Sequence, residues 1–420
     1  MDNIKALTID WNRSLLIDSP IDDELIRRVT PKILTLRQES NEPITIGIDS
    51  PGGSLASLDV LLGLLTGPNQ DGKMGKIITV ATHRAYSAAA NFLAFGTYAV
   101  ALAHSQVLYH DVRYGGMENV TPEKARVAAK SLQDMNDMFA LRLASKVIQR
   151  LIWIYIDLRS DFKDIQKAFP EPYKLYSAIA DAYAPEVDGY QSFDLSNFAT
   201  ALWANLSPQN DTLIRSVMKR LQRWILLTNI TKTVSTYRQK GSRIPGLLDG
   251  PRHLYKRFDG SPEHFQSSEE GLKLIISLIV AEISTVKTER VNFTLVLDRA
   301  AREYSILDSM NDPKHVRNAT DLMLNNPHIF FEDKHASDID HMSEVEKTEI
   351  YAKAAPYATL LWLFCVLLCR ELFEGEHVLK PQDAQLLGLV DEVSGGGPIQ
   401  SRRDFRLEQA QMAAEAPQVD

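Results

Sequence analysis

The sequence predicts an α/β fold with a largely parallel sheet, interrupted by a large and mostly helical insertion. Short apolar runs alternate with stretches of helical periodicity through residues 1–150, and the same alternation returns near residue 355. Between these parts, helical periodicity occurs in pieces that are separated by prolines, over roughly 200 residues, which is the size of a domain. We therefore expect an α/β core in two parts around an insertion.

The expected division of the chain has four parts. It consists of residues 1–150 as the N-terminal part of the core, 151–354 as the insertion, 355–395 as the C-terminal part of the core, and 396–420 as a tail. The length of 420 residues is more than a single core usually holds, which favours this organisation.

The first strands and helices surround a glycine turn. Residues 13–18 have a strand pattern and residues 21–37 have helical periodicity. A second strand at residues 44–48 ends in the turn Asp49-Ser-Pro-Gly-Gly53, and residues 54–65 form the next helix. Adjacent glycines suit a tight strand-to-helix turn with positive φ.

A second strand-turn-helix unit follows. Residues 76–82 form its strand, the turn at residues 83–87 ends at Ser87, and Gly96 closes a helix at residues 88–95. Further strands at residues 98–101 and 106–109 lead to His110. Because N–H groups at a helix start have no intrahelical partner, an oxyanion could bind beside Ser87.

After His110, Thr121 and Pro122 provide a helix start, and the apolar pattern continues to about Gln149. Residues 358–372 form an apolar helix, and a small strand and a helix follow it. The longest apolar run, residues 358–369, is too short to span a bilayer.

These motifs resemble the proteolytic subunit of the Clp protease. The similarity lies in Ser50-Pro-Gly-Gly53, the small-residue turn around Ser87, and His110 followed by Gly115-Gly116. It covers about residues 10–150 and a short C-terminal segment. The resemblance implies a ClpP/crotonase-like core of repeated β-β-α units in a spiral, and a serine-type peptidase, hence a hydrolase.

The resemblance also implies the site residues. Ser87 corresponds to the nucleophile and His110 to its general base, while the N–H groups of Gly53 and Ala88 correspond to the oxyanion hole. The segment that ends in Gly388-Leu-Val-Asp391 resembles the closing segment of the family, and this places Glu376 at the catalytic acid. The sequence departs from the family at His83, where glycine is preferred, and at Ala88, where methionine is preferred.

Each of these residues also has a purely structural interpretation. Ser87 could cap the helix that follows it, His110 could be a core histidine, and Glu376 could favour the dipole at a helix start. Cys365 and Cys369 lie on one face of an apolar helix and are expected to be buried, reduced thiols. The segment His335–His341 contains metal-ligand residue types but matches no strong metal pattern, so we expect no metal and no cofactor.

Four functions remain open. The first is a Clp-type serine endopeptidase that acts on polypeptides, and the second is a catalytically inactive relative with an assembly or scaffold role. The third is a Ser-Lys peptidase resembling signal peptide peptidase A, with Lys130 or Lys146 as the base. The last is a crotonase-type acyl-CoA enzyme, in which the Ser-His pair would have no role.

Composition and the resemblance give the expected partners and location. A net charge of −8 argues against general nucleic-acid binding, and the N-terminus lacks the pattern of a secretory signal. We expect a cytoplasmic protein that does not act on membranes. The resemblance implies a homo-oligomer, in which the long helix after His110 joins two rings, and an ATP-dependent (AAA+) unfoldase as a further partner.

Overall fold

The computed structural model describes residues 9–69, 72–113, 121–158, 195–221 and 342–394, together with the single positions 224, 317, 320 and 321. The chain divides into two compact units. The first contains residues 1–173, 197–216 and 365–420, and the second contains residues 174–196 and 217–364. Every described strand lies in the first unit. Most of the expected insertion lies outside the described residues, so the four-part division stays a prediction.

The first unit contains a parallel sheet, which confirms the expected α/β fold class. Four strands lie side by side in chain order, and a short strand from the C-terminal segment pairs with the last of them. The strands are β1 (Ser14–Ile17), β2 (Ile44–Ser50), β3 (Ile77–Tyr86), β4 (Tyr98–Leu102) and β7 (Glu392–Ser394). Ile46 of β2, Val80 of β3 and Val100 of β4 are fully buried, as expected for the centre of a parallel sheet.

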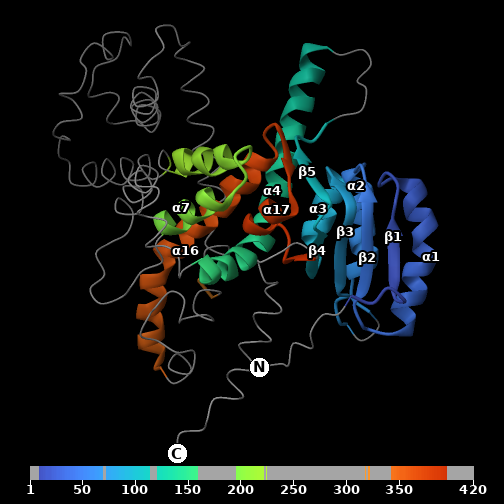
Figure 1. The fold of residues 1–420 in the computed structure, drawn as a ribbon, viewed down its shortest axis with the longest axis horizontal. Helices are drawn as coiled ribbons and strands as arrows, with labels where there is room; N and C mark the ends of the chain where they lie inside the picture. The colour runs from blue at the N-terminus through green and yellow to red at the C-terminus, as the bar shows by residue number, and fades with distance from the viewer. Residues whose placement is uncertain are drawn as a thin grey trace, which may run out of the picture. The chain divides into compact units, whose positions relative to one another are not determined.

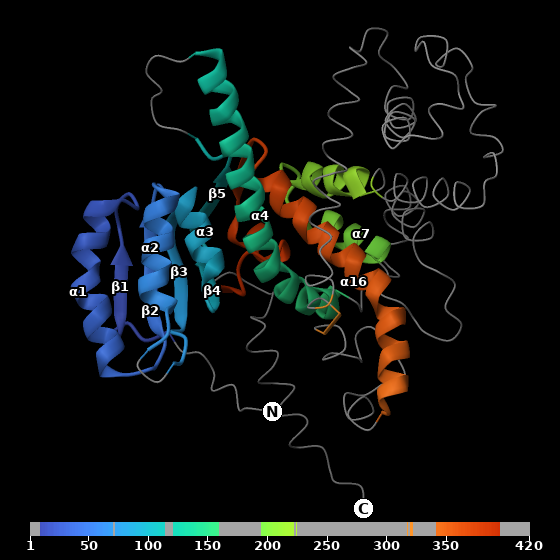
Figure 2. The same ribbon diagram turned by 180° about the vertical axis from the view of Figure 1, so that it is seen from behind.

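Three helices connect these strands: α1 (Asp23–Glu39), α2 (Leu55–Thr66) and α3 (Ala88–Phe95). Asp22 caps α1 by accepting a hydrogen bond from Leu25 N, and Ser54 caps α2 by accepting one from Ser57 N. Right-handed crossovers between strands that are neighbours in chain order place successive helices on the same face of a sheet. The helices accordingly follow one another along the sheet (Figure 1 and Figure 2).

Strand β3 is longer than the sequence predicted. The expected turn at residues 83–86 is wrong, because the strand continues to Tyr86. The first half of β3 pairs with β4, and the second half pairs with β5 (Gln106–His110). His83 and Arg84 obscured the strand pattern because they are polar, and both pair with Asp49, at 3.4 and 2.8 Å. The Arg84 guanidinium lowers the pKa of the Asp49 carboxyl.

The C-terminal segment adds a strand to the far side of β5. Strand β6 (Glu376–Leu379) is antiparallel to β5, and helix α17 (Pro381–Leu386) follows it. This confirms the expected strand and helix. It also shows that the interpretation of Glu376 as a helix-start residue is wrong, because Glu376 opens a strand.

Helix α4 (Pro122–Leu158) contacts both the N-terminal and the C-terminal parts of the first unit. Thr121 Oγ1 accepts a hydrogen bond from Lys124 N at 3.2 Å, which confirms the predicted cap, although the helix runs further than Gln149. Arg150 is 5% exposed and donates to the carbonyl oxygens of Ala94 and Leu389 and to the Asp391 carboxylate. One buried guanidinium therefore joins α4, α3 and the C-terminal segment.

Residues 211–221 are also helical, and the remaining labelled helices are α7 (Leu195–Asn205) and α16 (Glu344–Leu372). The latter extends the predicted apolar helix towards its N-terminus by including the charged residues that precede it. Cys365 and Cys369 are buried free thiols, as expected, and burial raises the pKa of both.

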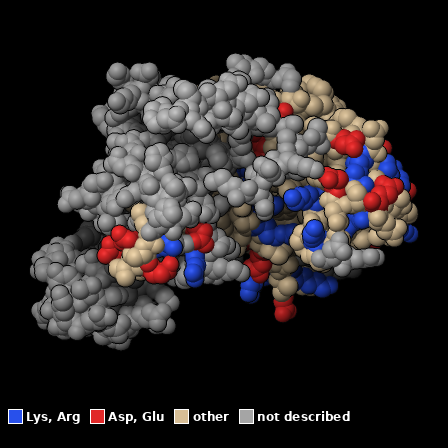
Figure 3. All heavy atoms as spheres, turned by 90° about the horizontal axis from the view of Figure 1, so that it is seen from below, with Lys and Arg blue, Asp and Glu red and all other residues tan. Residues whose placement is uncertain are grey.

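The described surface carries both signs of charge. Figure 3 shows lysine and arginine intermingled with aspartate and glutamate on the described part of one face. Among the helices that the structure describes, none has a stretch sufficiently long and apolar to cross a bilayer.

Removing the Arg150 guanidinium should destabilise the first unit strongly. The variant Arg150→Met leaves the Asp391 carboxylate and several carbonyl oxygens without their buried partner, so we expect a loss of about 3–5 kcal/mol of unfolding free energy. Urea unfolding followed by circular dichroism measures this loss. Arg28→Ala is the matched control, because the Arg28–Asp18 pair is exposed and should cost less than about 1 kcal/mol. Equal losses in the two variants would contradict the structural role of Arg150.

Candidate active site

Ser87 occupies a strained turn between β3 and α3. Its φ of 56° and ψ of −120° make it the single non-glycine residue with positive φ among the described residues. Its N–H group donates to Leu108 O at 2.7 Å, and its carbonyl accepts from Ala90 N at 3.0 Å. The hydroxyl makes no capping hydrogen bond to the helix. The backbone therefore fixes the turn, and the interpretation of Ser87 as a side-chain cap is wrong.

Gly52 allows a second turn to approach Ser87. Its φ is +98°, and a Cβ atom at this position would lie 2.5 Å from Tyr86 O and 2.7 Å from Ser87 Cβ. Both conditions exclude a larger side chain without a local rearrangement. Ser50 holds the turn from the other side, because its hydroxyl donates to Ser19 O at 2.7 Å and accepts from Gly52 N at 3.2 Å.

The backbone of Gly53 packs against Ile21 on one side and faces the pocket on the other. Ile21 N donates to Gly52 O, and Ser54 N donates to Ile21 O, both at 2.8 Å, so these two groups point away from the pocket. In a parallel bridge the N–H group of the residue between them points the opposite way. Within the described residues, neither Gly53 N nor Ala88 N donates a hydrogen bond to the protein. Both N–H groups are thus available to an oxyanion.

His110 is held at the end of β5 by its neighbours. The preceding residue, Tyr109, is fully buried, donates to Ala90 O on α3 at 3.1 Å, and contacts Phe373 edge-on. Desolvation raises the Tyr109 pKa, so the phenol stays a donor. After His110, Val112 N donates to Asn136 Oδ1 of α4 at 3.0 Å. The strand end is therefore attached to both α3 and α4.

The His110 ring contacts a backbone carbonyl. The distance between Nδ1 and Asp111 O is 2.6 Å. A carbonyl can only accept, so Nδ1 carries the proton and the Nε2 atom of the neutral ring has a lone pair. This is the tautomer that a general base needs. The structure thus places the carbonyl of Asp111, rather than its carboxylate, on the ring.

Glu376 lies directly opposite His110 across the β5–β6 pair. Residues in register on adjacent strands project to the same face, so the two side chains are neighbours. In this structure the Glu376 carboxylate is 3.7 Å from Arg113 Nη2, and both side chains are more than half exposed. The antiparallel pairing therefore brings the acid beside the histidine, while its carboxylate pairs with an arginine.

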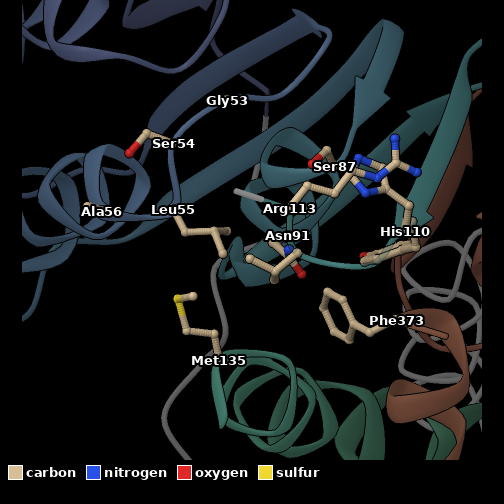
Figure 4. A pocket seen from close by; sticks show the side chains of 12 residues that line it. Gly53, Ser54, Leu55, Ala56, Ser87, Asn91, His110, Arg113, Met135 and Phe373 are labelled. Carbon is tan, nitrogen blue, oxygen red and sulfur yellow. The ribbon is translucent and has the colours of Figure 1, made fainter. Parts of the chain in front are cut away.

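Ser87 and His110 line one pocket with a volume of about 430 Å³ (Figure 4). Its wall also contains the Gly53 turn, the first residues of α2, side chains from α3 and α4, and Phe373, which follows α16. The lining residues are Gly53, Ser54, Leu55, Ala56, Ser87, Asn91, Tyr109, His110, Val112, Arg113, Met135 and Phe373. Neither Lys130 nor Lys146 is among them, although burial lowers the pKa of Lys146.

Three polar residues near the site were not predicted from the sequence. Arg113 and Asn136 follow no motif, and their roles depend on contacts with Glu376 and Val112 that are distant in sequence. Asn91 did leave a signal, because it is the one polar residue within Ala88–Phe95. A polar side chain in a fully buried helix needs an explanation.

Comparison with known proteins gives a family match for the N-terminal part of the chain. Residues 3–163 match the family model described as Clp protease. The resemblance to the Clp protease family is thereby confirmed. Among solved structures, a point mutant of ClpP1 from Listeria monocytogenes is similar, with 23% identity, a TM-score of 0.26, and coverage of 31% of this chain and 69% of that one. No curated protein matches the chain. The family match supports a peptidase, which is a hydrolase.

No group of three metal-ligating side chains gathers within the described ranges. The segment at residues 335–341 lies outside those ranges. The pocket itself contains one imidazole, one guanidinium and one amide.

Adding a methyl group at Gly52 should disturb both turns. We expect Gly52→Ala to lower the free energy of unfolding by about 1–3 kcal/mol, since positive φ and the contacts with Tyr86 O and Ser87 Cβ are unfavourable for alanine. Gly63→Ala is the control within α2, where a new Cβ meets nothing within 4 Å, and it should stabilise the protein by about 0.5–1 kcal/mol. Urea unfolding compares the two. An unchanged free energy of unfolding in Gly52→Ala would contradict the close contact between Gly52 and the Ser87 turn.

Proposed function

We propose that the chain is a serine endopeptidase of the Clp type that cleaves polypeptides by a Ser-His-acid mechanism. One observation carries the proposal: the hydroxyl of Ser87, which does not cap its helix, shares a pocket with His110 and with the Gly53 turn. Serine is a weak nucleophile unless a base and oxyanion donors lie beside it. The match of residues 3–163 to the Clp protease family supports the same reaction class.

The residues take the following roles. His110 Nε2 accepts the Ser87 proton as Oγ attacks the substrate carbonyl carbon, and the Gly53 and Ala88 N–H groups bind the oxygen that becomes negative. The position of Ala88 at the start of α3 adds the positive end of the helix dipole. The imidazolium then gives its proton to the leaving amine, and water releases the acyl group by the same steps in reverse order.

Glu376 is the acid in this proposal. Asp111 O orients neutral His110, but a carbonyl stabilises the imidazolium less than a carboxylate does. The cross-strand position of Glu376 lets its carboxylate take over the Nδ1–H group when it leaves Arg113. Both side chains of the ion pair are more than half exposed, which leaves them space to rotate.

The proposal extends to assembly and partners, as in the family. It includes a homo-oligomer with polypeptide substrates, an ATP-dependent (AAA+) unfoldase as a possible partner, and a cytoplasmic location. Ring assembly is supported by exposed apolar residues on α4, where Val127 and Met138 are 64% and 44% exposed.

A catalytically inactive scaffold is the alternative. The pairing of Glu376 with Arg113 favours it, as do the departures from the family at His83 and Ala88. A Ser-Lys peptidase receives less support, because Lys130 is exposed and neither candidate lysine lines the pocket.

A fluorophosphonate probe tests the nucleophile. We expect the wild-type chain to be labelled at one serine and Ser87→Ala to lose the label and at least about 10³-fold of any peptide hydrolysis. Intact-mass spectrometry detects the adduct. Ser54→Ala is the matched control, because Ser54 also begins a helix beside the pocket but uses its hydroxyl as a cap, and it should keep the label. A folded wild-type protein that stays unlabelled would favour the scaffold.

Paired substitutions test the acid. If Glu376 orients His110, Glu376→Gln should lower kcat/KM by about 10²- to 10⁴-fold, whereas Arg113→Gln should change it by less than about tenfold. If Glu376 only forms the ion pair with Arg113, the two variants should lower kcat/KM by the same factor. Steady-state hydrolysis of a fluorogenic peptide distinguishes these outcomes.

A further inference from the structure

Asn91 has a buried side-chain oxygen without a hydrogen-bond partner among the described residues. It lies one helical turn after Ser87, and its N–H group donates to Ser87 O at 3.3 Å. The side chain belongs to a residue that is 2% exposed, and within the described residues its Oδ1 atom has no hydrogen-bond partner. Buried amides are almost always bonded, and an unpaired one is costly. A ligand in the pocket could supply the missing hydrogen bond.

The surroundings of Asn91 in the pocket are apolar. Leu55 belongs to α2 and Met135 to α4, and Phe373 follows the end of α16. Figure 4 shows Asn91 among these side chains, with Ser87 and His110 beyond it. The hydroxyl of Tyr109 is engaged with Ala90 O and thus offers no proton to this space. Asn91 is therefore the neutral hydrogen-bonding side chain of the apolar end of the pocket.

This end of the pocket suits a substrate side chain. The residue whose carbonyl carbon is attacked by Ser87 has its side chain two bonds from the reacting carbon, so the side chain must start beside the nucleophile. Asn91 and the apolar residues line the same pocket next to Ser87. Rotation about the last side-chain bond lets the amide present either its oxygen or its NH₂ group.

We propose that Asn91 determines which substrate side chain the pocket accepts at the residue that supplies the attacked carbonyl. The pocket prefers an uncharged amide side chain at that residue, such as that of glutamine, over an aliphatic side chain of equal length. The inference rests on the proposed peptidase function and names its substrate class. An aliphatic substrate side chain would exclude water from the Asn91 amide and offer it no hydrogen bond. An amide side chain of the substrate would donate to the Asn91 oxygen and accept from the Asn91 NH₂ group.

Two peptide diphenyl phosphonates that differ in one side chain test this preference on the full chain. One has a glutamine-type side chain at the reacting position and the other a norleucine-type side chain. Ser87 Oγ forms a bond to phosphorus, a phenoxide leaves with the bonding electrons, and the Ser87 proton passes to His110. The second-order rate of labelling at Ser87, followed by mass spectrometry, is the readout.

We expect the wild-type chain to react about 10- to 100-fold faster with the glutamine-type probe. The isosteric variant Asn91→Leu should reverse the order, and it should melt at the same temperature or higher because it removes an unpaired buried amide. A wild-type preference for the norleucine-type probe would overturn the inference and leave the proposed function standing. A severe loss of folding in Asn91→Leu would also overturn it, since Asn91 would then be a structural residue. Equal absence of labelling in wild type and Ser87→Ala would refute the proposed function itself.

Discussion

The contact between Gly52 and the Ser87 turn is the constraint on which the site depends. Two backbone turns approach so closely that a Cβ atom at Gly52 would lie within 2.7 Å of both Tyr86 O and Ser87 Cβ. This contact places the Gly53 N–H group beside the start of α3. The N–H groups of Gly53 and Ala88 therefore come from two different strand-helix units whose turns are in contact. The strained φ of Ser87 persists because hydrogen bonds to Leu108 O and from Ala90 N hold the residue on both sides.

The division of β3 between two partners brings the remaining groups together. Its first half pairs with β4 and its second half with β5, so β5 leaves the main sheet and ends beside Ser87. The antiparallel β6 then carries Glu376 from the C-terminal segment to a position opposite His110. Buried Arg150 secures this segment to α3 and α4, so the position of Glu376 depends on a contact far from the pocket.

The sequence predicted those parts of the site that depend on local patterns. The glycine turn at Gly52 and Gly53, the helix that begins at Ala88 and the strand that ends at His110 all follow from apolar periodicity and turn residues. The end of β3 was missed because pairing with β5, rather than apolar alternation, extends it across His83 and Arg84. Long-range partners, namely Asn136 for Val112 and Arg113 for Glu376, have no local pattern and could not be predicted.

Three unfavourable features lie close together at the pocket. Within one helical turn of α3, Ser87 has positive φ. In the part of the chain that the structure describes, the Ala88 N–H group has no acceptor and Asn91 Oδ1 has no partner. Elsewhere, buried Arg150 and Asp383 are hydrogen-bonded, although Arg370 Nη1 and Gln385 Oε1 are buried without a partner among the described residues. The three features beside Ser87 differ from these atoms because they lie close to one another at a pocket. A bound substrate would relieve two of them, because its carbonyl oxygen meets the N–H group and its side chain meets the amide.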